Sequence, residues 1–191
     1  MTHSIAIFAS GSGSNAENII NHFRNSRSAE VRLVISNKND AFVIDRAKKL
    51  QVPCAVFDKK SDFSGDVLFK LLLNNKIDLI VLAGFLWLLP ATLIEKFPKR
   101  IINIHPALLP EYGGKGMYGS KVHQAVSESG DVESGITIHY VNEHYDQGDI
   151  IFQTSCQIKA GENPESIAQK VHQLEYEYYP KVIEEVLNKL V

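Results

Sequence analysis

The sequence contains little cysteine and no long apolar run. Only two cysteines occur among the 191 residues, Cys54 and Cys156, and they form no CxxC motif. They lie far apart in the chain, so we expect two reduced structural thiols and no disulfide framework. No apolar stretch approaches the roughly 18 residues of a membrane span, and the N-terminus lacks the basic region and long apolar stretch of a signal peptide. These absences predict a cytoplasmic protein with no membrane partner.

The sequence also lacks an excess of charge of one sign. Its formal net charge is -2 at pH 7, and 22% of its residues are charged. Nucleic-acid-binding domains usually carry a basic patch, so we expect no nucleic-acid partner. The seven histidines show neither an HExxH motif nor a Cys/His pattern, which argues against a metal site. A small anionic substrate is still compatible with this composition, because a few donors suffice to bind it.

Short apolar runs alternate with longer amphipathic segments in the first half of the chain. We expect strands at residues 5–9, 31–35, 54–57, 79–83 and 101–105. We expect helices at residues 15–23, 40–50 with Asp40 as the cap, around 67–73, and at 92–97. Strands that alternate with helices imply βαβ units and a parallel sheet.

The pattern changes in the second half of the chain. The expected segments are a Gly-rich loop at 111–119, a helix at 121–129, and two strands, antiparallel to each other, at 135–141 and 150–157. Asn163-Pro164 then favours the start of a last helix, with asparagine as the cap and proline at the first helical position. We therefore predict an α/β fold with a doubly wound, mostly parallel, Rossmann-like sheet and antiparallel C-terminal strands. One domain over residues 1–191 is expected.

A Gly-rich turn, residues 9–16, follows the first predicted strand. Glycines let the backbone approach a ligand, and the helix N-terminus that follows offers free N–H groups to an anion. Gly11, Gly13 and Ala16 also satisfy a GxGxxG/A pattern. A dinucleotide site, however, needs an acidic residue at the end of the second strand, and residues 35–38 (ISNK) provide none. The turn therefore favours a single phosphate, although a tight turn without a ligand is the alternative.

An apolar segment follows the fourth predicted strand. Phe85, Leu86, Trp87 and Leu88 occur there in succession. Ligands of open α/β sheets bind beyond the carboxyl ends of the strands, so these side chains could line a pocket for a flat aromatic ligand. Ordinary core packing is the alternative interpretation.

Three polar residues suit acyl transfer to an amine. Asn103 and His105 lie two residues apart at the end of the fifth predicted strand, on the same face of the sheet. Asp146 lies in the loop between the last two strands. An amide N–H₂ and a protonated imidazole can stabilise an oxyanion, while a nearby carboxylate raises the imidazole pKa and accepts the proton that the amine loses. The alternatives are a structural histidine and a turn-forming aspartate.

Several segments together resemble the folate-dependent glycinamide ribonucleotide formyltransferases of purine synthesis. They are ASGSGSN at 9–15, LAGF at 82–85, INIHPALLPEYGGKGMYGSKVH at 102–123, SGITIHYV at 134–141 and DQG at 146–148. The resemblance covers nearly the whole chain. It implies an enzyme that transfers the formyl group of the co-substrate 10-formyltetrahydrofolate to the amine of 5-phosphoribosylglycinamide, in de novo purine (IMP) biosynthesis. It also implies small-molecule substrates only, no metal, and a monomer or homodimer.

The resemblance assigns roles to individual residues. The catalytic trio would be Asn103, His105 and Asp146, with His139 behind it. The acceptor would contact Gly13, Ser14 and Asn15, chiefly through its phosphate, and Glu175 through its sugar. The folate would lie against Leu86, Trp87, Leu88 and Leu89, near Asn103, with its tail near Lys60. The N-terminal half would thus bind phosphate, and the C-terminal half would hold the folate and the catalytic residues.

Two positions depart from the family pattern. Trp87 stands where many relatives carry a basic residue, and Lys60 replaces an arginine near the folate tail. Lysine keeps the charge but loses bidentate pairing to a carboxylate, so folate-tail binding is expected to be weaker or altered. Two related families use other acceptors: methionyl-tRNA formyltransferases carry an extra C-terminal domain, and formyltetrahydrofolate hydrolases an extra N-terminal one. Neither domain is expected in this sequence, and a noncatalytic nucleotide- or folate-binding module is the remaining alternative.

Overall fold

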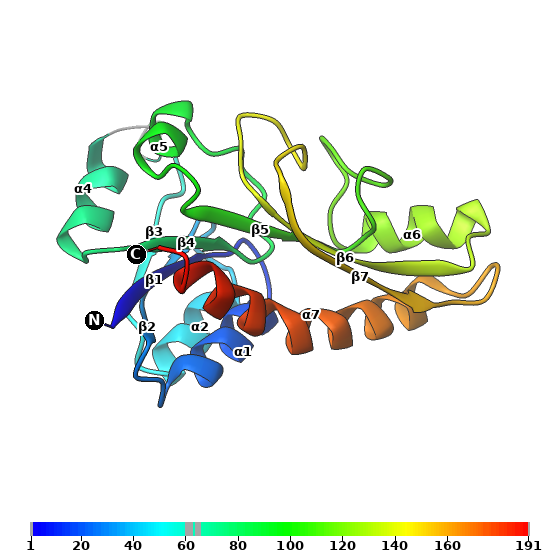
Figure 1. Ribbon diagram of the computed structural model, residues 1–191, viewed down its shortest axis with the longest axis horizontal. Helices are drawn as coiled ribbons and strands as arrows, with labels where there is room; N and C mark the ends of the chain where they lie inside the picture. The colour runs from blue at the N-terminus through cyan, green and yellow to red at the C-terminus, as the bar shows by residue number, and fades with distance from the viewer. Residues whose placement is uncertain (1, 60–62, 64–65, 191) are drawn as a thin grey trace.

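The computed structural model describes residues 2–59, 63 and 66–190, and the strands of this part form one sheet. The strand order is β3-β2-β1-β4-β5-β6-β7 (Figure 1). The strands are β1 (His3–Phe8), β2 (Ala29–Ser36), β3 (Cys54–Val56), β4 (Leu79–Leu82), β5 (Ile101–His105), β6 (Glu133–Tyr140) and β7 (Ile150–Gln157). The helices are α1 (Ser14–Phe23), α2 (Val43–Lys49), α4 (Asp66–Asn74), α5 (Ala91–Lys96), α6 (Ser120–Ser129) and α7 (Pro164–Leu187).

The sheet is parallel from β3 to β5 and antiparallel beyond it. Strand β1 pairs in parallel with β2 and β4, and the pairs β2–β3 and β4–β5 are parallel as well. Strand β6 runs antiparallel to both β5 and β7. The predicted fold class, a mostly parallel doubly wound sheet with antiparallel C-terminal strands, is therefore confirmed. The sequence did not predict that β5 pairs with β6 in antiparallel orientation.

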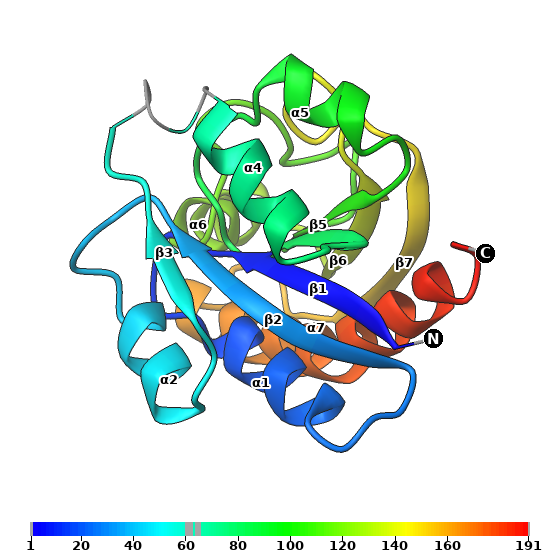
Figure 2. The same cartoon turned by 90° about the vertical axis from the view of Figure 1, so that its left-hand side faces the viewer.

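Helices cover both faces of the sheet (Figure 2). Ile5 and Ile7 of β1 point into a core shared with α1, α2, α6 and α7. Ala6 and Phe8 of the same strand point to the other face, into a core shared with α4 and α5. Because side chains alternate along a strand, a strand covered on both faces reads as a continuous apolar run. That is why the short apolar runs of the sequence mark the central strands.

Two helix starts were expected from capping residues. At α7, Asn163 accepts a hydrogen bond from the backbone N–H of Ser166 at 2.8 Å, with Pro164 behind it, so this expectation is confirmed. At α2 it is wrong, because the helix begins only at Val43 and Phe42 occupies the N-cap position. The backbone N–H of Val43 donates instead to the carbonyl of Gly11 at 3.1 Å. A long-range contact therefore sets the start of α2, which local capping rules do not anticipate.

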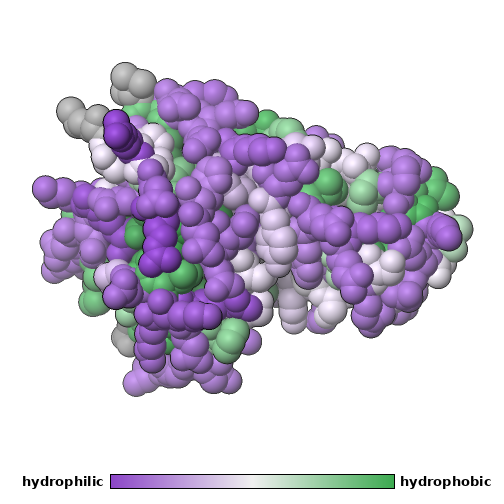
Figure 3. All heavy atoms as spheres, turned by 90° about the horizontal axis from the view of Figure 1, so that it is seen from below, coloured by the Kyte–Doolittle hydropathy of each residue, from purple (hydrophilic) through white to green (hydrophobic). Residues whose placement is uncertain are grey.

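The outer surface is mostly polar. Figure 3 shows the molecule from the side of α7 in Figure 1, where hydrophilic residues dominate and apolar ones form small separate areas. This agrees with helices that turn one apolar face to the sheet and a polar face to water. Among the described residues, none of the helices combines the length and the apolar character that crossing a membrane requires. Cys54 and Cys156 are both free, as expected.

Candidate active site

A cavity of about 350 Å³ opens at the carboxyl ends of the central strands. The chain runs from β1 to β2 and β3 on one side and then returns to β4 on the other side of β1. Segments that leave β1 and β4 in opposite directions create a crevice, where ligands of this fold class bind. Ser10 joins the two sides, since its N–H donates to the carbonyl of Gly84 at 3.0 Å and its Oγ accepts from the N–H of Leu86 at 2.9 Å.

The Gly-rich turn forms one end of this cavity. Gly13 has φ of 74° and caps α1 without a side-chain hydrogen bond, so the first N–H groups of the helix face the cavity end. Asn15 donates from Nδ2 to Oε2 of Glu175 at 2.8 Å. The structure thus brings together all four residues expected to contact the acceptor: Gly13, Ser14, Asn15 and Glu175 line the same cavity.

Glu175 is a buried carboxyl group, only 6% exposed, on the face of α7 that points into the cavity. Burial raises its pKa, while the hydrogen bond from Asn15 and the nearby His172 act in the opposite direction. A buried carboxyl group close to the N-terminus of α1 can accept hydrogen bonds from hydroxyl groups of a ligand. It is therefore placed as an acceptor-sugar contact would require.

The loop after β4 forms the apolar end of the cavity. Leu86, Trp87, Leu88 and Leu89 all line it. Leu89 is buried and Leu88 is 43% exposed. The segment therefore contributes to the core and also lines the pocket, which were the two alternatives drawn from the sequence. Phe63 holds the loop through ring contacts with Phe85 at 5.3 Å and Trp87 at 5.4 Å. Lys60, expected near the folate tail, lies outside the described residues.

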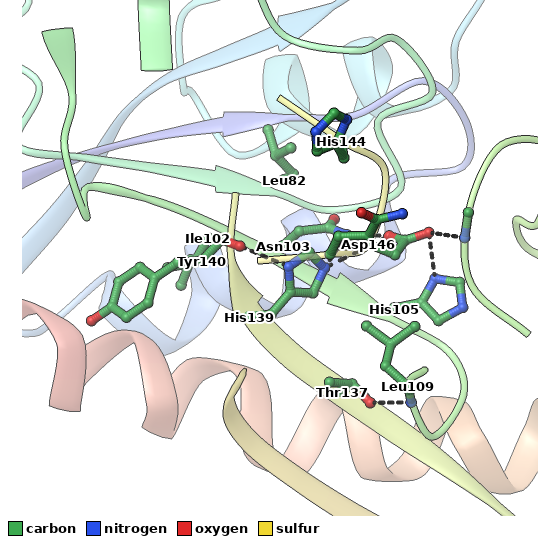
Figure 4. Close-up of polar contacts among 12 residues, drawn as sticks. Leu82, Ile102, Asn103, His105, Leu109, Thr137, His139, Tyr140, His144 and Asp146 are labelled. Carbon is green, nitrogen blue, oxygen red and sulfur yellow. Dashed lines mark hydrogen bonds and ion pairs between the residues drawn. The ribbon is translucent and has the colours of Figure 1, made fainter. Parts of the chain in front are cut away.

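Asn103, His105 and Asp146 meet at the end of β5 (Figure 4). Nδ2 of Asn103 lies 3.4 Å from Oδ1 of Asp146, and Nδ1 of His105 lies 3.6 Å from Oδ2 of Asp146. His139, which pairs with Asn103 across β5 and β6, completes the cluster behind it. Nε2 of His139 lies 3.1 Å from Nδ2 of Asn103 and 3.6 Å from Oδ1 of Asp146. The sequence therefore located residues that the fold brings into direct contact.

The hydrogen bonds fix the orientation of the Asn103 amide. Nδ1 of His139 lies 2.8 Å from the carbonyl of Tyr140, and because a carbonyl only accepts, this nitrogen carries the proton. Nε2 of a neutral His139 is then an acceptor, so Asn103 must present its N–H₂ group to it. One amide hydrogen is held by His139, and the second faces Asp146 across the longer distance. The second hydrogen is the one that can turn to a ligand.

His105 is buried, with 4% of its side chain exposed. Its Nε2 donates to the carbonyl of Tyr112 at 2.8 Å, so Nδ1 is the nitrogen that faces Asp146 and the cavity. The net pKa of His105 is lowered: burial lowers it most, and His139 also lowers it, whereas Asp146 and the Tyr112 carbonyl raise it. Asp146 thus acts in the expected direction, but the expectation of a net raised pKa is wrong, because desolvation of the imidazolium exceeds the effect of the carboxylate.

Asp146 is held as a carboxylate. Burial alone raises its pKa, but the imidazoles of His139 and His105 and the backbone N–H of Gly114, which donates to Oδ2 at 2.9 Å, outweigh this and lower the net pKa. The residue has φ of 57°, a left-handed conformation that aspartate tolerates better than most residues. Gly148 follows in the same turn, where an added Cβ would lie 1.7 Å from the carbonyl oxygen of Tyr140. This close approach explains the glycine of the Asp-Gln-Gly segment.

Some residues of the cavity were not identified from the sequence. They are His123 of α6, His172 of α7, and Lys115, His144 and Tyr145, all of which line the cavity. They come from separate segments with no motif spacing, so only the packing of α6 against α7 brings the two histidines together. Among the described residues, no group of three His, Cys, Asp or Glu side chains could hold a metal ion.

Comparison with known proteins places this geometry in a family. The formyl transferase family model matches residues 3–183. The chain belongs to the formyl transferase family. Its family relatives include the phosphoribosylglycinamide formyltransferase of Bacillus subtilis, 37% identical over 189 residues, which cover 96% of this chain and 94% of that protein. The chloroplastic phosphoribosylglycinamide formyltransferase of Arabidopsis thaliana is 42% identical over 185 residues; the match covers 94% of this chain but 63% of that longer protein.

Solved structures of similar proteins share the fold over the whole chain. Glycinamide ribonucleotide transformylase 1 from Geobacillus kaustophilus superimposes with a TM-score of 0.87 at 35% identity, over 98% of this chain and all of its own (100%). The phosphoribosylglycinamide formyltransferase from Bacillus halodurans has a TM-score of 0.87 at 34% identity, over 98% of this chain and 97% of its own. These structures therefore share the sheet of this chain, including the antiparallel strands, of which β6 carries His139 and leads to Asp146.

Proposed function

We propose that this protein transfers the formyl group of 10-formyltetrahydrofolate to the amine of 5-phosphoribosylglycinamide, as an enzyme of de novo purine synthesis. The observation that carries the proposal is the contact of Asn103, His105 and Asp146 in a cavity lined by the N-terminus of α1 and by the apolar loop after β4. Membership in the formyl transferase family and the names of its relatives support it. Both substrates are small molecules, and the protein acts as a monomer or homodimer.

The two ends of the cavity suit the two substrates. The phosphate of the acceptor would bind the first N–H groups of α1, with Ser14 and Asn15 as side-chain donors and Glu175 on the sugar. The flat pteridine of the folate would lie against Leu86, Trp87, Leu88 and Leu89, and Lys60 would reach the acidic tail. The reacting amine and formyl groups would then meet between the two ends, at the carboxyl end of β5.

The chemistry needs no covalent enzyme intermediate. The amine nitrogen attacks the formyl carbon, and a tetrahedral oxyanion forms. The amide hydrogen of Asn103 that faces Asp146 in the unliganded protein would turn to stabilise this oxyanion, and the proton shed by the amine passes to the pair formed by Asp146 and His105. Protonation of N10 of the folate then accompanies cleavage of its bond to the formyl carbon. The products are the N-formylated acceptor and tetrahydrofolate.

The electrostatics of the pair fit this order of events. His105 is neutral at pH 7 in the unliganded protein because its pKa is lowered, and its Nδ1 is then free to accept a proton. Once protonated, it faces the Asp146 carboxylate at 3.6 Å and adds a positive charge beside the oxyanion. The negative charge of the developing oxyanion therefore stabilises the protonated imidazole. An interaction that strengthens in the transition state accelerates the reaction.

A turnover assay tests the proposed function directly. Purified protein is mixed with 10-formyltetrahydrofolate and glycinamide ribonucleotide, and tetrahydrofolate release is followed by absorbance. Release that depends on glycinamide ribonucleotide would establish both donor and acceptor, and reactions without acceptor or with initiator tRNA serve as controls. Release without any acceptor would indicate a hydrolase, and no release under any of these conditions would contradict enzymatic formyl transfer.

A further inference from the structure

Two histidines face each other in the wall of the cavity, and one of them, His172, precedes Glu175 by about one turn of α7. The rings of His123, on α6, and His172, on α7, lie 6.1 Å apart at an interplanar angle of 90°. Both side chains line the cavity together with Gly13 and Asn15. His123 is 3% exposed, whereas His172 is exposed on its helix. Neither residue takes part in the formyl transfer described above.

His123 carries a polar atom that the folded chain leaves unused. Its Nδ1 is buried and has no hydrogen-bond partner within the described part of the chain, and the same is true of Oδ1 of Asn15. Buried polar side-chain atoms are nearly always hydrogen-bonded, and an exception needs an explanation. Two such atoms, both in side chains that line one cavity, point to a ligand that supplies donors and acceptors.

The electrostatic environment keeps His123 neutral without a ligand. Burial, together with the neighbouring His172 and His105, lowers the pKa of His123 to about 4. The titratable groups that act on His123 are His172 from α7 and His105 from β5, and Glu175 and the first residues of α1 line the same cavity. Glu175 is absent from the groups that act on the pKa of His123, and its own pKa is raised by burial. The described residues therefore supply no negative charge that offsets the lowering, and an anion in the cavity would supply one.

A phosphate monoester is an anion with suitable chemistry. Its second pKa is about 6, so it carries nearly two negative charges at pH 7 and offers three strong acceptor oxygens. A dianion beside a buried imidazole favours the protonated ring, and a protonated ring donates from both nitrogens. The free N–H groups of α1 contribute the remaining donors.

We propose that His123, backed by His172, contacts the phosphate of the acceptor and takes up a proton as the dianion binds. The inference rests on the proposed function for the identity of the acceptor. The phosphate end would then become positively charged only when it is occupied. Acceptor binding would weaken as the pH rises, because the proton becomes less available, while binding of the folate would not change.

Isothermal titration calorimetry with ribose 5-phosphate tests the proton uptake without any turnover. Titrations of the intact protein at pH 7.5 in two buffers of different ionisation enthalpy give the number of protons bound with the ligand. We expect an uptake of about one proton per phosphate in the wild type, because the dianion shifts His123 from neutral to charged. His123→Asn should abolish the uptake and weaken binding about tenfold, as loss of one charge-assisted hydrogen bond predicts.

His22→Asn is the matched control, because His22 is exposed on α1, pairs with Glu184 and lies away from the cavity-lining residues. It should leave both proton uptake and affinity unchanged. Wild-type binding without proton uptake, or no binding of ribose 5-phosphate at all, would overturn the inference. An uptake that persists in His123→Asn would also overturn it.

Steady-state kinetics separate this inference from the proposed function. In the wild type, KM for glycinamide ribonucleotide should rise about tenfold per pH unit above pH 7, as the uptake of one proton requires, while KM for the folate stays constant. His123→Asn should flatten this dependence and leave the folate KM unchanged. Turnover with a pH-independent acceptor KM would refute the role of His123 and keep the proposed function. Proton-linked binding of ribose 5-phosphate without turnover would support the role of His123 and contradict the proposed function.

Discussion

Asp146 is more than a turn-forming residue, because its carboxylate meets polar groups from separate elements. The N–H of Gly114 donates to Oδ2 at 2.9 Å, Asn103 approaches Oδ1 at 3.4 Å, and the imidazoles of His105 and His139 each lie 3.6 Å away. Together these groups overcome the tendency of burial to raise its pKa. A carboxylate held ionised in a cavity is a typical acid–base residue.

Substitution of Asp146 by Asn should remove proton transfer and leave substrate binding almost intact. The amide keeps the size of the side chain but cannot accept the proton that the amine loses. We expect kcat to fall by about 10²–10⁴-fold, the usual contribution of general acid–base catalysis, with the folate KM within about threefold of wild type. Asp149→Asn, three residues further along and exposed, is the control. Equal kcat in Asp146→Asn and the wild type would refute the assignment.

Glu175 is a buried carboxyl group of the cavity, and its ionisation lowers the stability of the folded protein. Its pKa is raised by burial above the usual value of 4.5, so its favourable contribution to folding is complete below that value and is lost as the pH rises through the folded-state pKa. Glu175→Gln removes the buried charge and leaves a carbonyl that can accept from Asn15. We expect the variant to gain stability over the wild type as the pH is raised from 4 to 8, by about 1.4 kcal/mol for each unit of pKa shift.

Thermal unfolding of Glu175→Gln and the wild type at pH 4 and pH 8 measures this gain in stability. The KM of Glu175→Gln for the acceptor should also rise, because the sugar loses a charged partner. Glu177→Gln is the control, since Glu177 is on the same helix but its side chain is 53% exposed and pairs with Lys181. A stability difference between Glu175→Gln and the wild type that does not change with pH would show that the buried carboxyl group does not titrate as described.

The Gly-rich turn shows, at the scale of elements, how local and long-range effects combine. Its glycine pattern and position after β1 predicted a turn that leads into a helix, which the structure shows, whereas anion binding by this turn stays a prediction. They did not indicate that α2 packs directly on it, with the N–H of Val43 bonded to Gly11 and Nε of Arg46 bonded to the carbonyl of Ser12 at 2.9 Å. The glycines therefore serve packing as well as ligand access.

Gly13→Ala should destabilise the protein, whereas Gly11→Ala should not. Gly13 has φ of +74°, and an added Cβ would lie 2.4 Å from Cγ2 of Val43. At Gly11 nothing lies within 4 Å of an added Cβ, and φ is not in the left-handed range. We expect a loss of about 1–3 kcal/mol in the free energy of unfolding for Gly13→Ala, from backbone strain and overpacking.

Urea denaturation measures the difference between the two glycine variants. Adding Val43→Ala to Gly13→Ala should restore little of the loss, because Cβ and Cα of residue 43 would still lie 2.5 and 2.7 Å from the added Cβ and the strain at positive φ remains. Equal stability of the two single variants would mean that the turn accommodates a side chain at either position.

Regular elements were more predictable than the contacts between them. Strands β5 and β7 have the predicted bounds because apolar and β-branched runs end at polar residues. Asn103 and His105 could be found because they interrupt an apolar strand, and Asp146 because it belongs to a motif. His123 and His172 could not, since 49 positions separate them in the chain and only the packing of α6 on α7 makes them neighbours. The net pKa of His105 also depends on burial, which the sequence does not specify.

At the scale of the whole molecule, a buried polar network joins the parallel half of the sheet to the antiparallel extension. Thr137 of β6 donates from Oγ1 to the carbonyl of Ala107 at 2.7 Å and accepts from the N–H of Leu109 at 3.0 Å. Gln153 of β7 donates to the same Oγ1 at 2.8 Å and to the carbonyl of Leu109 at 3.0 Å. The segment after β5 is thereby fixed against both C-terminal strands, and Figure 4 shows the bond between Leu109 and Thr137.

This network also supports the catalytic geometry. The fixed segment leads to Tyr112, whose carbonyl accepts from Nε2 of His105, and to Gly114, whose N–H donates to Asp146. A change in Thr137 should therefore affect both stability and catalysis, although Thr137 is absent from the residues that line the cavity.

Thr137→Val keeps the shape of the side chain and removes its hydroxyl group. The buried N–H of Leu109 then loses its acceptor and the carbonyl of Ala107 loses its donor, and each unsatisfied group costs about 1–3 kcal/mol. We expect a lower denaturation midpoint in urea, and a kcat reduced more than either KM, because the carbonyl that orients His105 is less well fixed. Thr137→Ser retains the hydroxyl and should keep kcat near the wild-type value, with only the stability loss of a missing methyl group. If the valine and serine variants lost kcat equally, packing of the methyl group, and not the hydrogen bonds, would be what couples the C-terminal strands to the site.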